Sequence, residues 1–177
     1  MGQSNARWRQ DDPRLNRAEA WPASLFPDAA YRYFRDAGCL VCALTVMLNE
    51  CSVENEQDEA VFNPWVLNQR LISCGAFSSD ADLELEDIAR LYPLDYLGEV
   101  PYSREALLLS AKKGAPCLVT VPGVNAARHF TALLDVTEDD ALVFDPCCGE
   151  RILSSYDQVC ELRLFTIEEE GLEGSDE

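Results

Sequence analysis

The sequence predicts an α+β fold in which helices precede a set of antiparallel strands. The first half of the chain has apolar residues at helical spacing, between residues that begin and end helices. The second half has short apolar runs separated by turn residues, as consecutive antiparallel strands require. With 177 residues, the chain is long enough for one domain with its own core. We therefore expect N-terminal helices packed on one face of an antiparallel sheet.

The most apolar helix is expected at residues 39–50, whose sequence CLVCALTVMLNE leaves almost no polar face. Gly38 permits a sharp turn just before it. Three more helices are expected where capping residues precede apolar periodicity: after Asn63-Pro64, after Asp80 or Asp82, and after Ser103. Five strands should follow, at residues 116–121, 129–136, 141–145, 150–154 and 161–167. An acidic turn makes the second and third of these strands a hairpin.

The apolar patterning places the domain at residues 26–167. Residues 1–25 are polar and are expected to form a loosely attached arm. Residues 168–177, EEEGLEGSDE, are expected to be a disordered acidic tail because they have no apolar surface to bury. No apolar run reaches the roughly 18 residues of a membrane span, and the first residues do not resemble a secretory signal. We therefore expect a cytoplasmic protein that does not enter a membrane.

The net charge of −18 is concentrated after residue 40. Residues 1–40 contain six Arg and five acidic residues, a net charge of +1, whereas residues 41–177 have a net charge of −19. Nucleic acid is not an expected partner, because binding to phosphates requires a basic surface. The acidic side chains either form a solvated surface or select a basic substrate or partner.

Eight cysteines are many for a chain without a secretory signal. Because the domain is large enough to fold without disulfides, we expect the thiols to be reduced. Four of them lie in or beside apolar stretches and are interpreted as small core residues: Cys51, Cys74, Cys117 and Cys160. The other four are candidates for chemistry: Cys39, Cys42, Cys147 and Cys148.

The single histidine, His129, begins one expected strand, and Asp145 ends the next. In a hairpin these two residues lie close to opposite one another, where an aspartate can orient an imidazole. Asp145 also precedes a proline, so its alternative role is to initiate a turn. Cys39 begins the apolar helix, where free N–H groups favour a thiolate and can bind an oxyanion. Together the three residue types favour nucleophilic catalysis by a thiol.

Several stretches share their order with one known family: AGCLVCALTVMLN at 37–49, NPWVLN at 63–68 running to CGAF at 74–77, GAPCLV at 114–119, HFTAL at 129–133, and DP at 145–146 followed by Gly149. They resemble the bacteriocin-processing cysteine peptidase-like family of the papain-like clan. The resemblance implies a papain-like fold and hydrolysis of a peptide or protein substrate, such as a double-glycine leader, without a cofactor. It implies Cys39 as the nucleophile, His129 as the base and acid, and Asp145 as the residue that orients the ring. The acyl-enzyme would then be a thioester.

The chain departs from this family at the oxyanion hole. Such peptidases usually have a glutamine about six residues before the cysteine, and Tyr33 occupies that position here. The oxyanion is then expected to rest on backbone N–H groups alone. The alternative is a catalytically weak or inactive papain-like module that binds a partner.

Two further alternatives use the cysteine pairs. Cys39 and Cys42 form a C-x-x-C at a helix start, a spacing typical of thiol–disulfide redox proteins. However, a helical or irregular segment precedes the pair, where such proteins have a strand. Cys39 and Cys42, together with Cys147 and Cys148, would also supply four thiolates for a tetrahedral zinc site.

Overall fold

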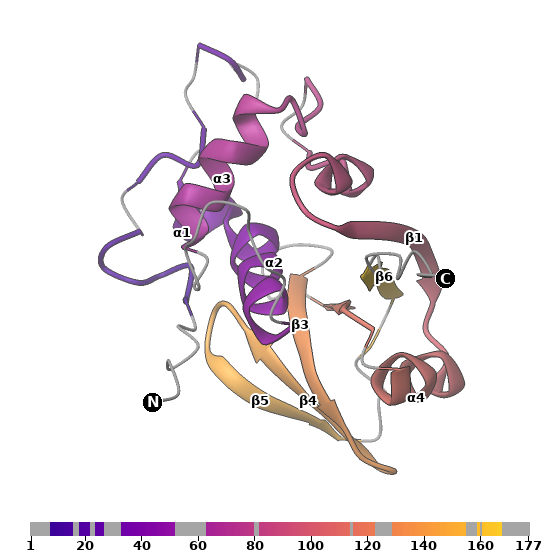
Figure 1. The fold of residues 1–177 in the computed structure, drawn as a ribbon. Helices are drawn as coiled ribbons and strands as arrows, with labels where there is room; N and C mark the ends of the chain where they lie inside the picture. Colours follow the sequence, from indigo (N-terminus) through magenta and orange to yellow (C-terminus); the bar gives the residue numbers. More distant parts are fainter. Residues whose placement is uncertain are drawn as a thin grey trace, which may run out of the picture.

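The computed structural model has an α+β fold built on one six-stranded antiparallel sheet with the strand order β1-β6-β2-β3-β4-β5 (Figure 1). The predicted α+β class is confirmed, and the papain-like arrangement that the resemblance implies stays a prediction. The structure describes residues 8–15, 18–21, 24–26, 33–51, 63–79, 82–113, 115–122, 129–154, 159 and 161–167.

The described residues form five helices: α1 (Phe34–Ala37), α2 (Cys39–Glu50), α3 (Pro64–Ser73), the 3-10 helix η1 (Leu85–Arg90) and α4 (Arg104–Lys113). α3 begins as predicted, because the Asn63 side chain accepts a hydrogen bond from the Trp65 N–H at 2.9 Å. The helix expected after Asp80 or Asp82 is instead the short η1. Pro93 follows it, and the chain enters a strand at Leu94.

The strands are β1 (Leu94–Pro101), β2 (Cys117–Val121), β3 (His129–Val136), β4 (Asp140–Asp145), β5 (Gly149–Ser154) and β6 (Glu161–Ile167). All five expected strands are present, and β1 is an additional one. Its sequence contains Gly98 and Pro101, which disfavour strands. β1 accommodates both because it is an edge strand, and Gly98 lies at an irregularity in the pairing with φ +111°.

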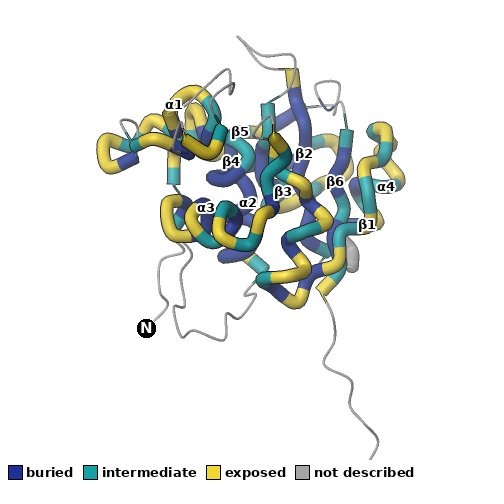
Figure 2. The backbone as a smooth tube through the Cα atoms, turned by 90° about the horizontal axis from the view of Figure 1, so that it is seen from above, coloured by how far each residue is buried: buried dark blue, intermediate teal, exposed yellow. Residues whose placement is uncertain are grey.

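The helices cover both faces of the sheet, so the expectation that they all pack on one face is wrong (Figure 2). Leu118 of β2 belongs to the core that contains α2 and α3. The neighbouring residues Cys117 and Val119 pack instead with Leu107 of α4. Because successive strand residues point to opposite faces, α4 covers the face away from α2. β2 is therefore buried along its whole length.

The N-terminal arm is packed against the domain where the structure describes it. Leu15, Ala20 and Trp21 are at most 6% exposed and belong to the same core as α2. The expectation of a loose attachment is therefore wrong for these residues. The acidic tail at 168–177 and Cys160 lie outside the described residues. In the part of the chain that is described, no helix has both the length and the apolar character of a membrane span.

Candidate active site

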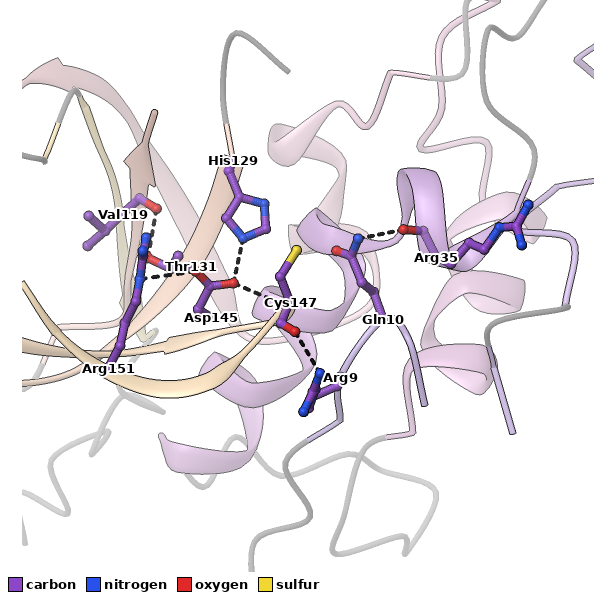
Figure 3. A network of polar contacts seen from close by, with 9 residues as sticks. All are labelled: Arg9, Gln10, Arg35, Val119, His129, Thr131, Asp145, Cys147 and Arg151. Carbon is purple, nitrogen blue, oxygen red and sulfur yellow. Dashed lines mark hydrogen bonds and ion pairs between the residues drawn. The ribbon is translucent and has the colours of Figure 1, made fainter. Parts of the chain in front are cut away.

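His129 and Asp145 meet at the same end of two neighbouring strands. β3 starts at His129, and β4 ends at Asp145. The antiparallel pairing of these strands places Ala132 opposite Phe144. One residue further toward the start of β3, Thr131 is opposite Asp145. His129 is thus the diagonal neighbour of Asp145 on the same face. His129 Nε2 lies 2.6 Å from Asp145 Oδ1, so the structure brings the two predicted residues into contact (Figure 3).

Asp145 is a buried carboxylate, 3% exposed, with partners on both oxygens. Oδ1 also accepts a hydrogen bond from the Cys147 N–H at 2.8 Å, while Arg151 Nε lies 3.0 Å from Oδ2. The Arg151 contact is an ion pair without hydrogen-bond alignment. Burial raises the pKa of Asp145, but the hydrogen bonds from His129 and Cys147 and the nearby positive charges lower it overall. Asp145 is therefore ionised, and its bond to Cys147 shows that it also initiates the turn.

The pKa of His129 is raised from 6.5 to about 9. Burial lowers this pKa, but hydrogen bonds to Asp145 and Cys39, together with the charges of these two residues, outweigh burial. His129 is therefore protonated at neutral pH, between a carboxylate and a thiol group. This arrangement is typical of a thiolate–imidazolium pair.

Cys39 is the first residue of α2 and is partly buried. α2 packs against β3, and this packing brings Cys39 to His129. Gly38 is needed for space: a Cβ there would lie 2.5 Å from the carbonyl oxygen of Phe34. Its φ of −79° shows that it permits a close approach of α1 to α2, not a left-handed turn.

Cys42 lies in the core, one helical turn beyond Cys39. It is 0% exposed, and burial raises the pKa of its thiol. Thiol–disulfide exchange requires a thiolate, so the raised pKa of Cys42 disfavours it as the resolving thiol of the redox alternative.

One group of described side chains has the composition of a metal site: His129, Asp145 and Cys147. Their ligand atoms all lie within 4.8 Å of one another. The four-cysteine zinc site that the sequence offered as an alternative is not formed by the described residues, because their four thiols do not come together as one group.

The N-terminal arm brings to the site a glutamine that the sequence did not indicate. The Gln10 N–H donates to the Pro146 carbonyl at 2.9 Å, and Gln10 Nε2 donates to the Arg35 carbonyl at 2.6 Å (Figure 3). Arg9 donates to the Cys147 carbonyl at 2.8 Å, so the arm is attached to the turn that follows Asp145. Oε1 of Gln10 is buried without a hydrogen-bond partner among the described residues.

An NMR titration of the single histidine tests this electrostatic arrangement. The imidazole signals of His129 should titrate with a midpoint near pH 9. Because the folded-state pKa is raised, protonated His129 contributes its full stabilisation below the ordinary histidine pKa of 6.5, and this contribution is lost as the pH rises through about 9. The chain has one histidine, so the signals need no assignment by mutation. A midpoint at or below 6.5 would show that His129 has no ionised partner.

Comparisons with known proteins do not assign the chain to a family. No protein-family model matches the sequence, and no curated protein sequence matches it significantly. The geometry of Cys39, His129 and Asp145 is therefore the basis on which a function is inferred.

Proposed function

We propose that the protein is a cysteine-dependent hydrolase of peptide or amide bonds, with Cys39, His129 and Asp145 as its catalytic triad. The observation that supports the proposal is the position of His129, whose ring lies 2.6 Å from Asp145 Oδ1 and whose pKa is raised by its interactions with Asp145 and Cys39. A thiol nucleophile, an acid–base and a group that orients the ring are the parts that such a reaction requires. The resemblance to papain-like peptidases, which have the same residue order, agrees with this proposal.

In the proposed reaction, the Cys39 thiolate attacks the carbonyl carbon of the amide and forms a tetrahedral oxyanion. His129 then gives its proton to the leaving amine, the C–N bond breaks, and the acyl group remains on Cys39 as a thioester. Neutral His129 next takes a proton from a water molecule, which attacks the thioester. The acid product leaves, and the thiolate–imidazolium pair is restored. Asp145 stays ionised and orients the ring throughout.

In this proposal Gln10 and the N-terminal N–H groups of α2 stabilise the oxyanion. Tyr33, at the position where related peptidases have a glutamine, is exposed. Gln10 Nε2 uses one N–H on the Arg35 carbonyl, one turn before Cys39, and has a second N–H to donate. A donor of this kind contributes about 100- to 1000-fold in rate.

The charge of the protein suggests the class of substrate. A net charge of −18 attracts cations and slows the approach of acidic peptides. We therefore propose peptides or proteins rich in Lys and Arg as the preferred substrates. Their association should weaken as the salt concentration rises.

Trapping the acyl-enzyme tests the proposed function. The protein is incubated with electrophilic peptide probes and with a panel of basic peptides, and adducts are located by peptide mass mapping. One adduct is expected, on Cys39, at pH 6 as well as at pH 8, because a His-paired thiolate persists at low pH. The peptide panel should be cleaved under the same conditions.

The two exposed cysteines of the β4–β5 turn are internal controls in this experiment. Burial and nearby negative charges raise the pKa of Cys147 to about 11, and the pKa of Cys148 is also raised. Both thiols should therefore stay unlabelled at pH 6. Labelling of Cys39 that begins only near pH ~8.5, the range of an ordinary thiol, would contradict the ion pair. Peptide binding with neither labelling nor cleavage would favour the inactive binding module.

A further inference from the structure

Cys147 has no role in the proposed hydrolysis, yet it is fixed beside the catalytic pair. Its N–H donates to Asp145 Oδ1 at 2.8 Å, and its carbonyl accepts from Arg9 at 2.8 Å. The backbone of this turn is thus held on two sides. Figure 3 shows the sulfur of Cys147 on the same side of the turn as the ring of His129. The thiol, the ring and the carboxylate offer ligand atoms within 4.8 Å of one another.

We propose that His129, Asp145 and Cys147 bind a zinc ion, which replaces the proton that His129 shares with Asp145. An imidazole nitrogen, a carboxylate oxygen and a thiolate are the ligand types that zinc takes in proteins. Three protein ligands leave the fourth tetrahedral position to water. The thiol of Cys147 gives its proton to solvent when the ion binds.

The spacing of the ligand atoms fits this site after a small adjustment. Zinc–ligand bonds of about 2.0–2.3 Å at tetrahedral angles place ligand atoms about 3.3–3.8 Å apart. The distance of 2.6 Å between His129 Nε2 and Asp145 Oδ1 must therefore lengthen. The Cys147 sulfur, which lies within 4.8 Å of the other two ligand atoms, must move closer to them. Rotation of side chains at the end of a hairpin suffices for shifts of this size.

Charge and access also favour a cation here. The Asp145 carboxylate and a Cys147 thiolate together neutralise a divalent ion. Arg151 pairs with Oδ2 of Asp145 at 3.0 Å, which leaves Oδ1 to face the metal. Cys147 is exposed, so the ion enters directly from solvent. The net charge of −18 raises the local concentration of cations.

Bound zinc would switch off hydrolysis, and this consequence rests on the proposed function. With zinc on Nε2, the ring would be neutral and its only proton would be on Nδ1; loss of that proton would leave an imidazolate, so the ring would be a much weaker acid toward the leaving amine than the imidazolium. Asp145 would bind the metal and would no longer accept a hydrogen bond from the ring. Removal of the ion by a chelator would restore the catalytic pair.

Zinc binding is measured in the Cys39→Ser variant, because Cys39 is not one of the three ligands. Calorimetry of chelator-treated protein should show one zinc ion per chain. Co²⁺ used as a probe should give the intense absorption of a cobalt–thiolate bond. Neither readout depends on catalysis, so the result is independent of whether the proposed function is correct.

Adding Cys147→Ser to that variant should weaken zinc binding by at least about 100-fold, since even the loss of an outer-shell partner costs 10- to 100-fold. The cobalt–thiolate absorption should disappear. The matched control is Cys148→Ser, which removes the neighbouring exposed thiol and should change neither readout. Equal loss in both variants, binding that survives Cys147→Ser, or the lack of stoichiometric binding would overturn the proposal.

Inhibition is tested separately with Cys39 intact. Zinc should stop peptide cleavage, a chelator should restore it, and Cys147→Ser should resist inhibition. Zinc binding without any cleavage activity would refute the proposed function and leave the metal site standing. Cleavage without zinc binding would refute the metal site alone.

Discussion

Replacing Cys39 by serine should lower kcat/KM for peptide cleavage by at least about 1000-fold, because loss of a nucleophile in a hydrolase costs up to about a million-fold. His129 loses one of the partners that raise its pKa, and a serine hydroxyl, far less acidic than a thiol, does not form the ion pair with the ring. The variant should also lose labelling by electrophilic probes. Steady-state kinetics and peptide mass mapping measure the two effects. Cys39→Ala combined with His129→Ala should be no worse than either change alone, because these residues act as a unit.

The matched control for this substitution is Cys42→Ser, one turn further along α2. Cys42 is 0% exposed, so its replacement buries a hydroxyl. We expect a loss of about 1–3 kcal/mol in the free energy of unfolding, seen as a lower Tm, with labelling of Cys39 retained. In the redox alternative, Cys42→Ser would trap mixed disulfides and halt turnover. That result would rule out Cys39 as the sole nucleophile.

Asp145→Asn should reduce kcat/KM by well under the roughly 10,000-fold loss in kcat that the same change causes in serine proteases, because papain-like proteases function with a Cys-His-Asn triad. An amide cannot supply the negative charge that raises the pKa of His129. The His129 titration midpoint should therefore fall from about 9 toward 6.5. Probe labelling of Cys39 at pH 6 should decrease in parallel, because the neighbouring imidazolium is less stable.

The matched control for the lost charge is Asp135→Asn on β3. Asp135 is exposed, and its carboxylate accepts a hydrogen bond from the adjacent Val136 N–H at 2.8 Å. The substitution removes the same charge from the same sheet and should leave the His129 midpoint and kcat/KM nearly unchanged. Equal effects of the two substitutions would mean that net charge, not the contact between Asp145 and His129, sets the pKa.

The parts of the site that depend on local pattern were predictable from the sequence. An apolar run after Gly38 predicts where α2 begins, and hence where Cys39 lies. A hairpin with a short turn brings the start of β3 to the end of β4, and hence His129 to Asp145. The contact between Cys39 and His129 was inferred only from residue type. It depends on how α2 packs on β3, which no local pattern specifies.

The features that the sequence did not indicate depend on long-range contacts. The periodicity of α4 shows that one of its sides is buried but not which face of the sheet it covers. Gln10 is held at the site by a hydrogen bond from its backbone N–H to the Pro146 carbonyl. Almost every residue has the same backbone donor and acceptor, so the amino-acid sequence gives no sign of this contact. β1 contains strand-breaking residues that are tolerated only at an edge, and edge position is a property of the whole sheet.

The order of the strands has a consequence for how the protein is made. β6 comes last along the described chain, yet it lies inside the sheet between β1 and β2. On a ribosome, Cys39 is synthesised long before β6, and pairings between distant segments form late in folding. β2, which supports β3 and His129, is paired on both edges only after β6 has been inserted. A growing chain therefore has an ordinary cysteine at position 39, and the proposed nucleophile forms only after β6 has been synthesised.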